Sequence, residues 1–462
     1  MGKLNPFNPN SVVAPPLFAG RREQTLRILN KLEHVQKGLS ASFVLHGERG
    51  IGKTALAKLI RAVASGKKSQ GVEVLRKEHS LNFLSTYYCV EKGQHFHSVL
   101  QASLNSLTDQ LPLAALKRLA DRLGSIFKNG KFSFGAFSVE LEKPLKADHE
   151  QHLKDQAVSV LTNILEGLDE AGLKEGVKYS GLLIIIDEVH NVEDIEGIAQ
   201  LFRNITTTLD VNGLGRVSFM ILGYSEPIRD FFTGDPSARR SFDSILLTHM
   251  PKEEAKEVLI KGFDQARVAY DPQALEKHIL STGGYPHSIQ VLGHHLIELD
   301  TDDAINADDW SRALTQTTIE LQSKDFLDFY NFGKKPTMRE QVLDIMAVIG
   351  RPVSKMELKA ACDGKNIYQT TCLGELKRIG AVKEDRNTGL LTLQSQLFRT
   401  AILFDVVRRV AEQEQVDNTL LRAMQTYWER AERATQEVAP WVLPVPRESS
   451  LAKPVSSPPP QI

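Results

Sequence analysis

The sequence predicts an α/β protein in which a parallel sheet carries a phosphate-binding loop, followed by a helical lid and an α+β winged helix-turn-helix domain. Three observations lead to this fold class. The stretch SFVLHGERGIGKTALAK at 42–58 joins an apolar run to a helical pattern through a glycine-rich turn. The stretch GLLIIIDEVHN at 181–191 has five consecutive aliphatic residues and then two acids. Residues 339–401 read as three amphipathic helices and a charged hairpin.

The first motif, GERGIGKT, has the spacing of a nucleotide phosphate loop and lies between a strand expected at 43–45 and a helix expected at 55–64. In such a loop the glycines let backbone N–H groups turn towards the phosphates. Lys53 then reaches the β- and γ-phosphates, and the Thr54 hydroxyl ligates Mg²⁺. An accidental glycine turn is the alternative, and the strand-to-helix context disfavours it. The residues expected to bind the nucleotide here are Gly47, Arg49, Gly50, Ile51, Gly52, Lys53, Thr54 and Ala55.

The second motif is the apolar strand at 181–191. A run that is apolar at every position suits a strand covered on both faces, and ligands of parallel sheets lie at the carboxyl ends of the strands. Asp187 is therefore expected to hold Mg²⁺, and Glu188 to polarise the attacking water as the catalytic base. A hydrophobic strand that merely ends in an acid is the alternative for this motif taken alone.

Composition favours a multidomain protein without a global charge signal. The 462 residues suffice for about three domains, and 42% of them are hydrophobic. The 56 Lys and Arg nearly balance the 57 Asp and Glu, so a nucleic acid would have to be recognised locally. Cys89, Cys362 and Cys372 have neither disulfide nor zinc-ligand spacing, which favours a reducing compartment. Without a signal core or a spanning apolar run, we expect a cytoplasmic protein with no membrane partner.

The sheet domain is expected at 18–250, after an extended Pro/Asn-rich segment at 1–17. An amphipathic helix begins near Arg21. The chain between the two motifs is long, and an insertion is expected at about 111–150. Within it, the nearly alternating apolar pattern at 130–142 is typical of a bent hairpin or bulged strand. This hairpin is either an extra edge of the sheet or a surface that contacts a subunit or DNA.

Other periodic segments complete the expected sheet domain. A strand is expected at 81–90, helices at 97–110 and 151–169, and a buried strand at 216–226. Ser225, at the end of the last strand, either senses the γ-phosphate or is only a turn former.

A helical lid is expected at 251–335. Its centre contains His287, His294 and His295, which raises the question of a metal site. No Cys or acidic residue nearby in the sequence completes a ligand set, so these histidines are interpreted as solvated or packed.

The winged helix-turn-helix is expected at 338–401, with Ser354 capping its second helix and the third helix ending at Gly380. Because the segment is only slightly basic, DNA binding and protein docking both stay open. A helix at 402–436 and a disordered Pro/Ser tail at 437–462 are expected to follow. The polar residues placed to face DNA are Asn366, Gln369, Thr370, Lys377, Arg378 and Arg386.

With its motifs in this order, the chain resembles a bacterial member of the AAA+ class. The branch is similar to the Orc1/Cdc6 initiators and to archaeal-type ATPases that border on the STAND class, and the resemblance spans roughly 5–400. FAGRRE at 18–23 is similar to a box that lies against the adenine, which implies that Arg21 contacts the nucleotide. The resemblance implies Mg²⁺-dependent ATP hydrolysis coupled to a conformational change, often in a ring or arc of subunits.

Two further site residues follow from the resemblance. Where many members place a sensor arginine in the lid, this chain has Gly-Tyr-Pro-His, closer to the G-x-P of the STAND class. Pro286 is therefore expected at the nucleotide, and no lid arginine is assigned. Members also place an arginine after the sensor strand that reaches the neighbouring subunit's γ-phosphate. Arg239 and Arg240 occupy that stretch; Arg240 is favoured, and a solvated helix end is the alternative.

Two functions remain open from the sequence. The first is an ATP-driven switch that assembles with itself and acts on DNA or on a DNA-bound partner. The second is a STAND-like signalling or defence ATPase that recruits a protein effector through its winged helix. A repeat-containing sensor domain would favour the second function, and no repeats are visible after residue 401. A scaffold that binds nucleotide without hydrolysing it is disfavoured because Asp187 and Glu188 are both present.

Overall fold

A computed structural model of the chain contains two compact units, which are described separately. One unit comprises residues 1–321 with 395–400, and the other comprises 322–394 with 401–462. The residues that the structure describes are 4–13, 18–66, 80–111, 149–225, 227–233, 237–282, 284–332, 336–362, 370–385, 388–394 and 396–411. The hairpin predicted at 130–142 and the predicted C-terminal tail lie outside these residues.

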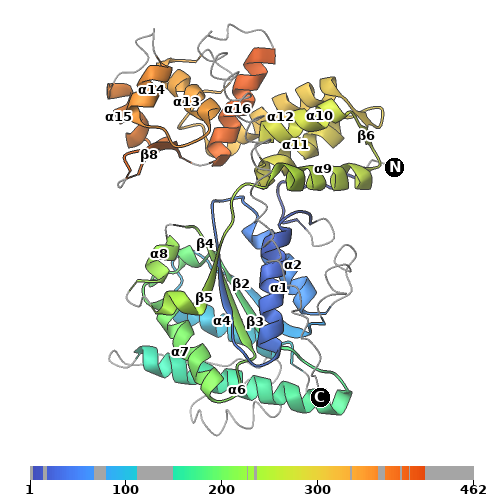
Figure 1. The fold of residues 1–462 in the computed structure, drawn as a ribbon, viewed down its shortest axis with the longest axis vertical. Coiled ribbons are helices and arrows are strands. Elements are labelled where there is room, and N and C mark those ends of the chain that lie inside the picture. Colours follow the sequence, from blue (N-terminus) through green and yellow to red (C-terminus); the bar gives the residue numbers. More distant parts are fainter. Residues whose placement is uncertain are drawn as a thin grey trace, which may run out of the picture. The chain divides into compact units, whose positions relative to one another are not determined.

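The larger unit is built on a five-stranded parallel sheet (Figure 1). Its strand order is β2-β3-β4-β1-β5, so the strand that leads into the phosphate loop has neighbours on both sides. The acidic strand β3 is separated from it by β4 alone. Because the strands are parallel, this arrangement brings both motifs to the carboxyl ends of the strands on one side of the sheet. The strands are β1 (Ser42–His46), β2 (Phe83–Cys89), β3 (Gly181–Asp187), β4 (Val217–Gly223) and β5 (Phe242–Leu246).

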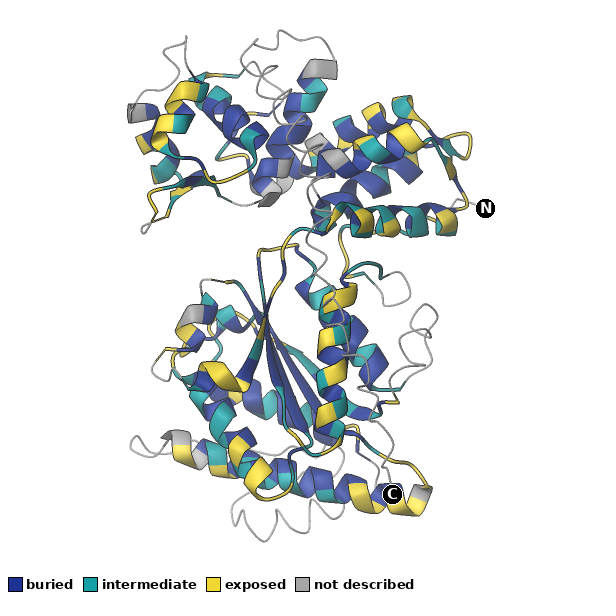
Figure 2. Ribbon diagram, in the orientation of Figure 1, coloured by how far each residue is buried: buried dark blue, intermediate teal, exposed yellow. Residues whose placement is uncertain are grey.

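Helices cover both faces of this sheet, as its apolar strands require. β3 and β4 are buried at every position, and Figure 2 shows the centre of the sheet in dark blue. One face packs against α1 (Arg22–Gln36) and α2 (Lys53–Ala64) (Figure 1). The other face packs against α4 (Phe96–Thr108), α6 (His149–Glu175) and α7 (Ile198–Val211).

The alternation of side chains along β3 divides its residues between two cores. Leu182, Ile184 and Ile186 join the cluster formed with α4, α6 and α7. Leu183 and Ile185, equally buried, point to the opposite face. The predicted α/β class with a parallel sheet is confirmed. As predicted, the strands that are apolar at every position are covered on both faces.

Strand β5 was not foreseen as a strand. Only Phe242 and Ile245 of its five residues are buried, because it lies at the edge of the sheet and pairs with β1 alone. A short segment with two buried positions lacks the continuous apolar run that identified the central strands.

The lid consists of four helices and a small parallel strand pair within the larger unit. The two-residue strand β6 (Ala269–Tyr270) follows the first of its helices, and β7 (Ala304–Ile305) precedes the last. The two strands pair with each other. α11 begins with Pro286 in its first turn, where a missing N–H costs nothing. The lid helices are α9 (Lys252–Ala266), α10 (Pro272–Thr282), α11 (Pro286–Leu299) and α12 (Ala307–Asp325).

The smaller unit contains three helices and an antiparallel hairpin, in the order that the sequence predicts for this segment. Ser354 accepts a hydrogen bond from the Glu357 N–H, and the Glu357 side chain returns to the Ser354 backbone, so the predicted cap is present. The elements are α13 (Met338–Ile349), α14 (Lys355–Ala361), α15 (Thr370–Arg378), β8 (Val382–Glu384) and β9 (Leu391–Leu393).

A further helix, α16 (Gln396–Ala411), begins before the position expected at 402. Buried Phe398 already belongs to its apolar face, which explains the earlier start. Within the smaller unit, Arg409 Nη2 lies 2.8 Å from Asp344 Oδ2, and Tyr330 donates to Asp344 Oδ1 at 2.6 Å. Burial raises the pKa of Asp344 to about 6, although Arg409 opposes this shift. These buried groups tie α13 and α16 together.

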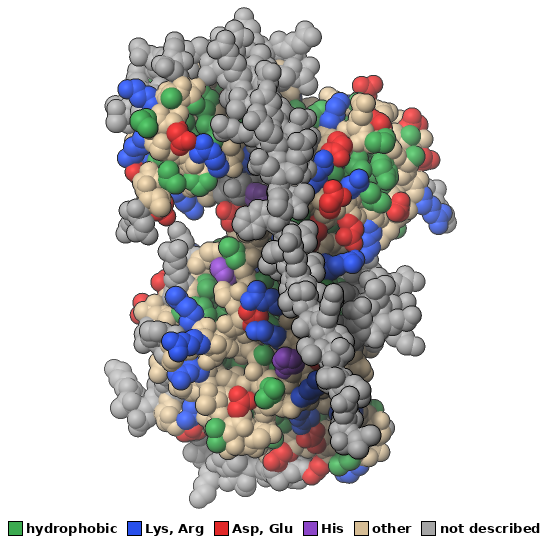
Figure 3. All heavy atoms as spheres, in the orientation of Figure 1, with side chains coloured by type: hydrophobic (Ala, Val, Ile, Leu, Met, Phe, Trp, Pro, Cys, Tyr) green, Lys and Arg blue, Asp and Glu red, His purple; other side chains and the backbone are tan. Residues whose placement is uncertain are grey.

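The surface carries both signs of charge. Figure 3 shows Lys and Arg side chains interspersed with Asp and Glu over the visible face, in keeping with the near balance of the composition. None of the helices in the described part of the chain is long and apolar enough to span a membrane.

Candidate functional site

The phosphate loop adopts a backbone that only glycine accommodates easily. Gly50 and Gly52 have φ values of 75° and 95°, in the left-handed region. At Gly47 a Cβ atom would lie 2.5 Å from the carbonyl oxygen of Leu247, so no side chain fits there. The spacing of the glycines therefore reflects both the turn of the loop and its close approach to the chain after β5.

Three side chains hold the carbonyl oxygens of the loop. Lys53 Nζ donates to the Gly47 oxygen at 3.1 Å and to the Glu48 oxygen at 2.9 Å. Arg21, which is 4% exposed, donates from Nη2 to the oxygen of Ile51 at 3.1 Å and also to that of Thr248. From the lid, the Tyr285 hydroxyl donates to the oxygen of Arg49. Burial lowers the pKa of Lys53, while the nearby carboxylates oppose that shift.

The acidic strand meets the loop at Asp187, which is 1% exposed. Its Oδ2 accepts hydrogen bonds from the Thr54 hydroxyl and from the Tyr87 hydroxyl, each at 2.6 Å. Its Oδ1 accepts from the Glu188 N–H at 2.8 Å. Burial and the bond to Asp187 raise the pKa of Tyr87, so this phenol remains a donor. Hydroxyl and carboxylate oxygens are the ligands that Mg²⁺ prefers, so the pair formed by Thr54 and Asp187 fits this ion.

Glu188 has a left-handed backbone, with φ 58°, and its Oε2 lies 3.0 Å from His190 Nε2. The hydrogen bond from His190 is the main reason that the pKa of Glu188 is lowered. The His190 ring lies 4.0 Å from the ring of Tyr224, which also lies under Lys53 Nζ at 4.8 Å. The Glu188 carboxylate, whose pKa is lowered, is thereby held near the lysine of the loop.

β4 ends at Gly223, so Ser225 lies two residues after the strand rather than within the stretch expected at 216–226, and it is exposed. Its hydroxyl is 3.1 Å from His46 Nδ1, and the other ring nitrogen of His46 is 3.0 Å from the Ser244 hydroxyl. His46, the last residue of β1, thus contacts the chain just after β4 and the middle of β5. The preceding residue, Tyr224, lines the pocket described next, whereas Ser225 does not.

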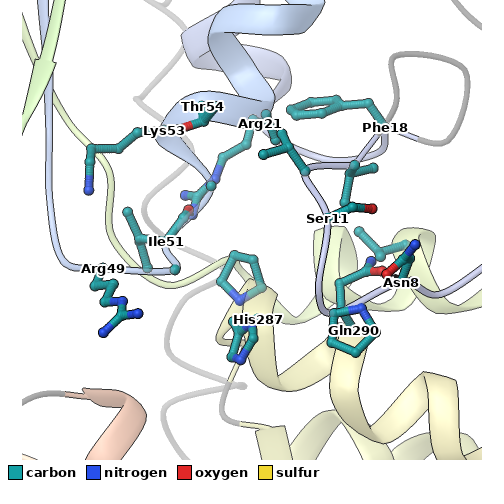
Figure 4. Close-up of a pocket in the computed structure, with 18 of the residues that line it drawn as sticks. Asn8, Ser11, Phe18, Arg21, Arg49, Ile51, Lys53, Thr54, His287 and Gln290 are labelled. Atoms are coloured by element: carbon teal, nitrogen blue, oxygen red, sulfur yellow. Dashed lines mark hydrogen bonds between the residues drawn. The ribbon is translucent and has the colours of Figure 1, made fainter. Parts of the chain in front are cut away.

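The loop borders a pocket of about 330 Å³ that is lined from three directions (Figure 4). The loop supplies one wall, and the start of α11 supplies Pro286, His287 and Gln290. The N-terminal segment 8–13 lies opposite the loop, with Phe18 beside it (Figure 4). The site residues predicted from sequence that line this pocket are Arg21, Arg49, Gly50, Ile51, Gly52, Lys53, Thr54, Ala55, Glu188 and Pro286.

The arginine pair lies on the short 3-10 helix η3 (Ala238–Ser241), and both residues are exposed. The Arg239 guanidinium lies over the Phe232 ring at 5.6 Å. Arg240 is followed by Ser241 and by Phe242, which is buried at the start of β5. Neither arginine lines the pocket of this chain.

Two of the three lid histidines, His294 and His295, contact neighbouring residues, and His287 lines the pocket. His295 Nε2 lies 2.9 Å from Glu320 Oε2, so an acidic residue distant in sequence does reach this ring. His294 Nδ1 lies 3.1 Å from the carbonyl oxygen of Phe7. Among the described residues, no group of three candidate metal ligands includes either histidine.

The residues predicted to face DNA are only partly described. Lys377 is half-buried and pairs with Glu384, which also pairs with Lys355 at 2.7 Å. Arg378 is exposed. Asn366, Gln369 and Arg386 lie outside the described residues, as does the side chain of Thr370.

Comparison with known proteins identifies the class of the first domain. Residues 17–212 match the family model of the AAA ATPase domain, and this stretch contains both sequence motifs. Together with the five-stranded parallel sheet, this match gives the larger unit an AAA+ type P-loop fold. No curated protein sequence matches the chain.

Several solved structures are similar to this chain at low identity. A Walker-type ATPase of Pyrococcus abyssi is 16% identical with a TM-score of 0.41, over 83% of this chain and 96% of that one. The Orc2 protein of Aeropyrum pernix is 15% identical with a TM-score of 0.40, over 88% and 99%. A STAND protein of Pyrococcus horikoshii with a tetratricopeptide repeat sensor is 15% identical with a TM-score of 0.34, over 91% and 50%. Nothing about the function of this chain follows from such distant likenesses.

Proposed function

Because residues 17–212 carry an AAA ATPase domain, we propose that this protein is a Mg²⁺-dependent ATPase that works as a molecular switch in an assembly of its own copies. The observation that carries the proposal is the meeting of Lys53, Thr54, Asp187 and Glu188 at one edge of the sheet. Thr54 and Asp187 are in hydrogen-bond contact, and Lys53 and Glu188 line the same pocket. Phosphate charge, metal and water would each meet a suitable group there.

Each of these side chains has a distinct task. Lys53 supplies positive charge to the β- and γ-phosphates, and the loop N–H groups orient them. Thr54 and Asp187 would hold the Mg²⁺, which would neutralise phosphate charge when bound. Glu188 accepts a proton from the attacking water, and its carboxylate is ionised at neutral pH, as a base requires. Arg21 and Pro286 border the nucleotide, and Ser225 stays a candidate sensor of the γ-phosphate.

The first test separates binding from hydrolysis. Lys53→Ala removes the phosphate charge and should abolish ATP binding at micromolar concentrations, whereas Glu188→Gln should bind ATP as the wild type does. Glu188→Gln should slow phosphate release by roughly 100-fold or more, since only the base is lost. ATP affinity and phosphate release are measured for both variants. An equal loss of ATP affinity in the two would contradict the assigned roles.

Completion of the site by a second subunit is the finer part of the proposal. Charge builds on the phosphoryl oxygens in the transition state, and an arginine from a neighbour can stabilise it. Arg240 is the candidate because it is exposed, lies outside its own pocket and is anchored by buried Phe242. Arg239 is the less suitable of the pair because Phe232 already engages its guanidinium.

Arg240→Ala should therefore bind ATP normally and hydrolyse it about 1,000-fold more slowly. Mixing it with Lys53→Ala subunits should restore turnover, because one interface then combines an intact loop with an intact arginine. Arg239→Ala is the matched control and should retain more activity. Wild-type specific activity should rise with protein concentration. If activity is independent of concentration and mixing gives no rescue, the site works within one chain.

The target of the switch is proposed to be DNA or a DNA-bound partner, reached through the winged helix of the smaller unit. The exposed Arg378 at the end of α15 supports phosphate contact, whereas Lys377 is already neutralised by Glu384. The alternative, a STAND-like ATPase that recruits a protein effector, is supported by the same ion pairs, since Glu384 offsets part of the positive charge of Lys355 and Lys377 on this face.

These two targets predict different salt dependence. If the winged helix binds DNA, Arg378→Ala should weaken binding and lower the slope of log affinity against log salt by about one. Lys377→Ala should change that slope by less, because its charge is paired with Glu384 in the free protein. Binding to a DNA duplex is measured across salt concentrations. Unchanged affinity for DNA when Lys377→Ala and Arg378→Ala are combined in one protein would assign the module to protein docking.

A further inference from the structure

Phe7 occupies a socket made by two glycines inside lid helices. The ring is 3% exposed, and its neighbours Gly262 of α9 and Gly293 of α11 have no side chain to oppose it. A Cβ at Gly262 would lie 2.1 Å from the Phe7 ring, and one at Gly293 would lie 2.7 Å away. Phe263 adds an edge-to-face contact at 6.0 Å between ring centroids. Glycine is a poor helix former, and at both places the Phe7 ring explains it.

Polar contacts fix the same segment to α11. The Asn5 side chain donates to the oxygen of His294 at 3.0 Å and to Glu298 Oε1 at 2.9 Å. His294 Nδ1 lies 3.1 Å from the carbonyl oxygen of Phe7. The Asn8 N–H donates to Gln290 Oε1 at 3.2 Å. The contacts of Asn5, Phe7 and Asn8 thus extend over a little more than two turns of α11.

The residues that follow this anchor form a wall of the pocket. Segment 8–13 lines the pocket directly after Phe7, together with Phe18, Met250 and Val258. Figure 4 shows Asn8 and Ser11 across the pocket from Lys53 and Ile51. A nucleotide whose phosphates lie on the loop therefore has its nucleoside end towards this wall.

We propose that Phe7 is a positioning residue that makes segment 8–13 a lid-borne wall for the nucleoside part of the bound nucleotide. The inference rests on the proposed ATP site and adds a function for the chain before the first helix. Because the anchor belongs to α9 and α11, the wall keeps its place only while it is seated on the lid. Affinity for the nucleoside part then depends on the socket, and affinity for the phosphates does not.

The test compares ATP with inorganic tripolyphosphate, which has the phosphates and lacks the nucleoside. Phe7→Ala should weaken ATP binding by on the order of tenfold and leave tripolyphosphate binding unchanged. Gly293→Ala fills the socket from the α11 side, and its methyl group displaces the Phe7 ring. This variant should therefore also weaken ATP binding and leave tripolyphosphate binding unchanged. Alanine is the better helix former, so loss of α11 would not explain this result. Leu4→Ala, at a side chain that is 70% exposed, is the matched control and should bind both ligands normally.

The outcomes distinguish this inference from the proposed function. Unchanged ATP affinity in Phe7→Ala and Gly293→Ala overturns the positioning role, and so does an equal weakening of both ligands. If the wild type itself binds neither ATP nor tripolyphosphate, the proposed ATP site is wrong, and the role inferred for segment 8–13 is wrong as well. Turnover measured over a range of ATP concentrations gives a second readout, because a positioning residue should raise KM and leave kcat close to the wild-type value.

Discussion

The carbonyl oxygens of the phosphate loop are the constraint on which the rest of the site depends. A loop that turns its N–H groups towards a ligand has to direct its carbonyl oxygens elsewhere, and each needs a donor. Lys53, Arg21 and Tyr285 supply those donors to Gly47, Glu48, Arg49 and Ile51. The donors come from α2, from the residue before α1 and from the lid, so three separate parts of the larger unit define one loop.

This arrangement links the lid to the chemistry of the sheet edge. Tyr285 is fully buried, directly precedes α11 and contacts the loop. α11 itself begins with Pro286 and contacts the Phe7 ring at Gly293. A displacement of α11 would therefore act on the loop carbonyl and on the far wall of the pocket together. On the opposite side, Asp187 accepts hydrogen bonds from both Thr54 and Tyr87, so the two proposed Mg²⁺ ligands are oriented by a residue of the neighbouring strand β2.

Local patterns were sufficient to predict four of the five strands of the sheet, both motifs and several helices, because apolar runs and glycine spacing are properties of short segments. Sequence patterns did not identify Tyr87, His190 or Tyr285 as site residues. Tyr87 contacts Asp187, which is 100 residues away, and Tyr285 contacts Arg49, which is 236 residues away, so no local pattern could reveal these two contacts. Arg21 was predicted from a family box and holds a loop carbonyl. The glycines inside α9 and α11 were the one available sign of the Phe7 socket, but a glycine in a helix does not reveal its partner.

The most direct test of this account is phosphate release from ATP by the purified wild-type protein, measured with Mg²⁺ and again after its removal with EDTA. The geometry of Thr54, Asp187 and Glu188 predicts steady release with Mg²⁺ that falls to the background of Lys53→Ala when the metal is removed. The account would be contradicted if the protein bound Mg²⁺ and ATP tightly but released phosphate no faster than Lys53→Ala does.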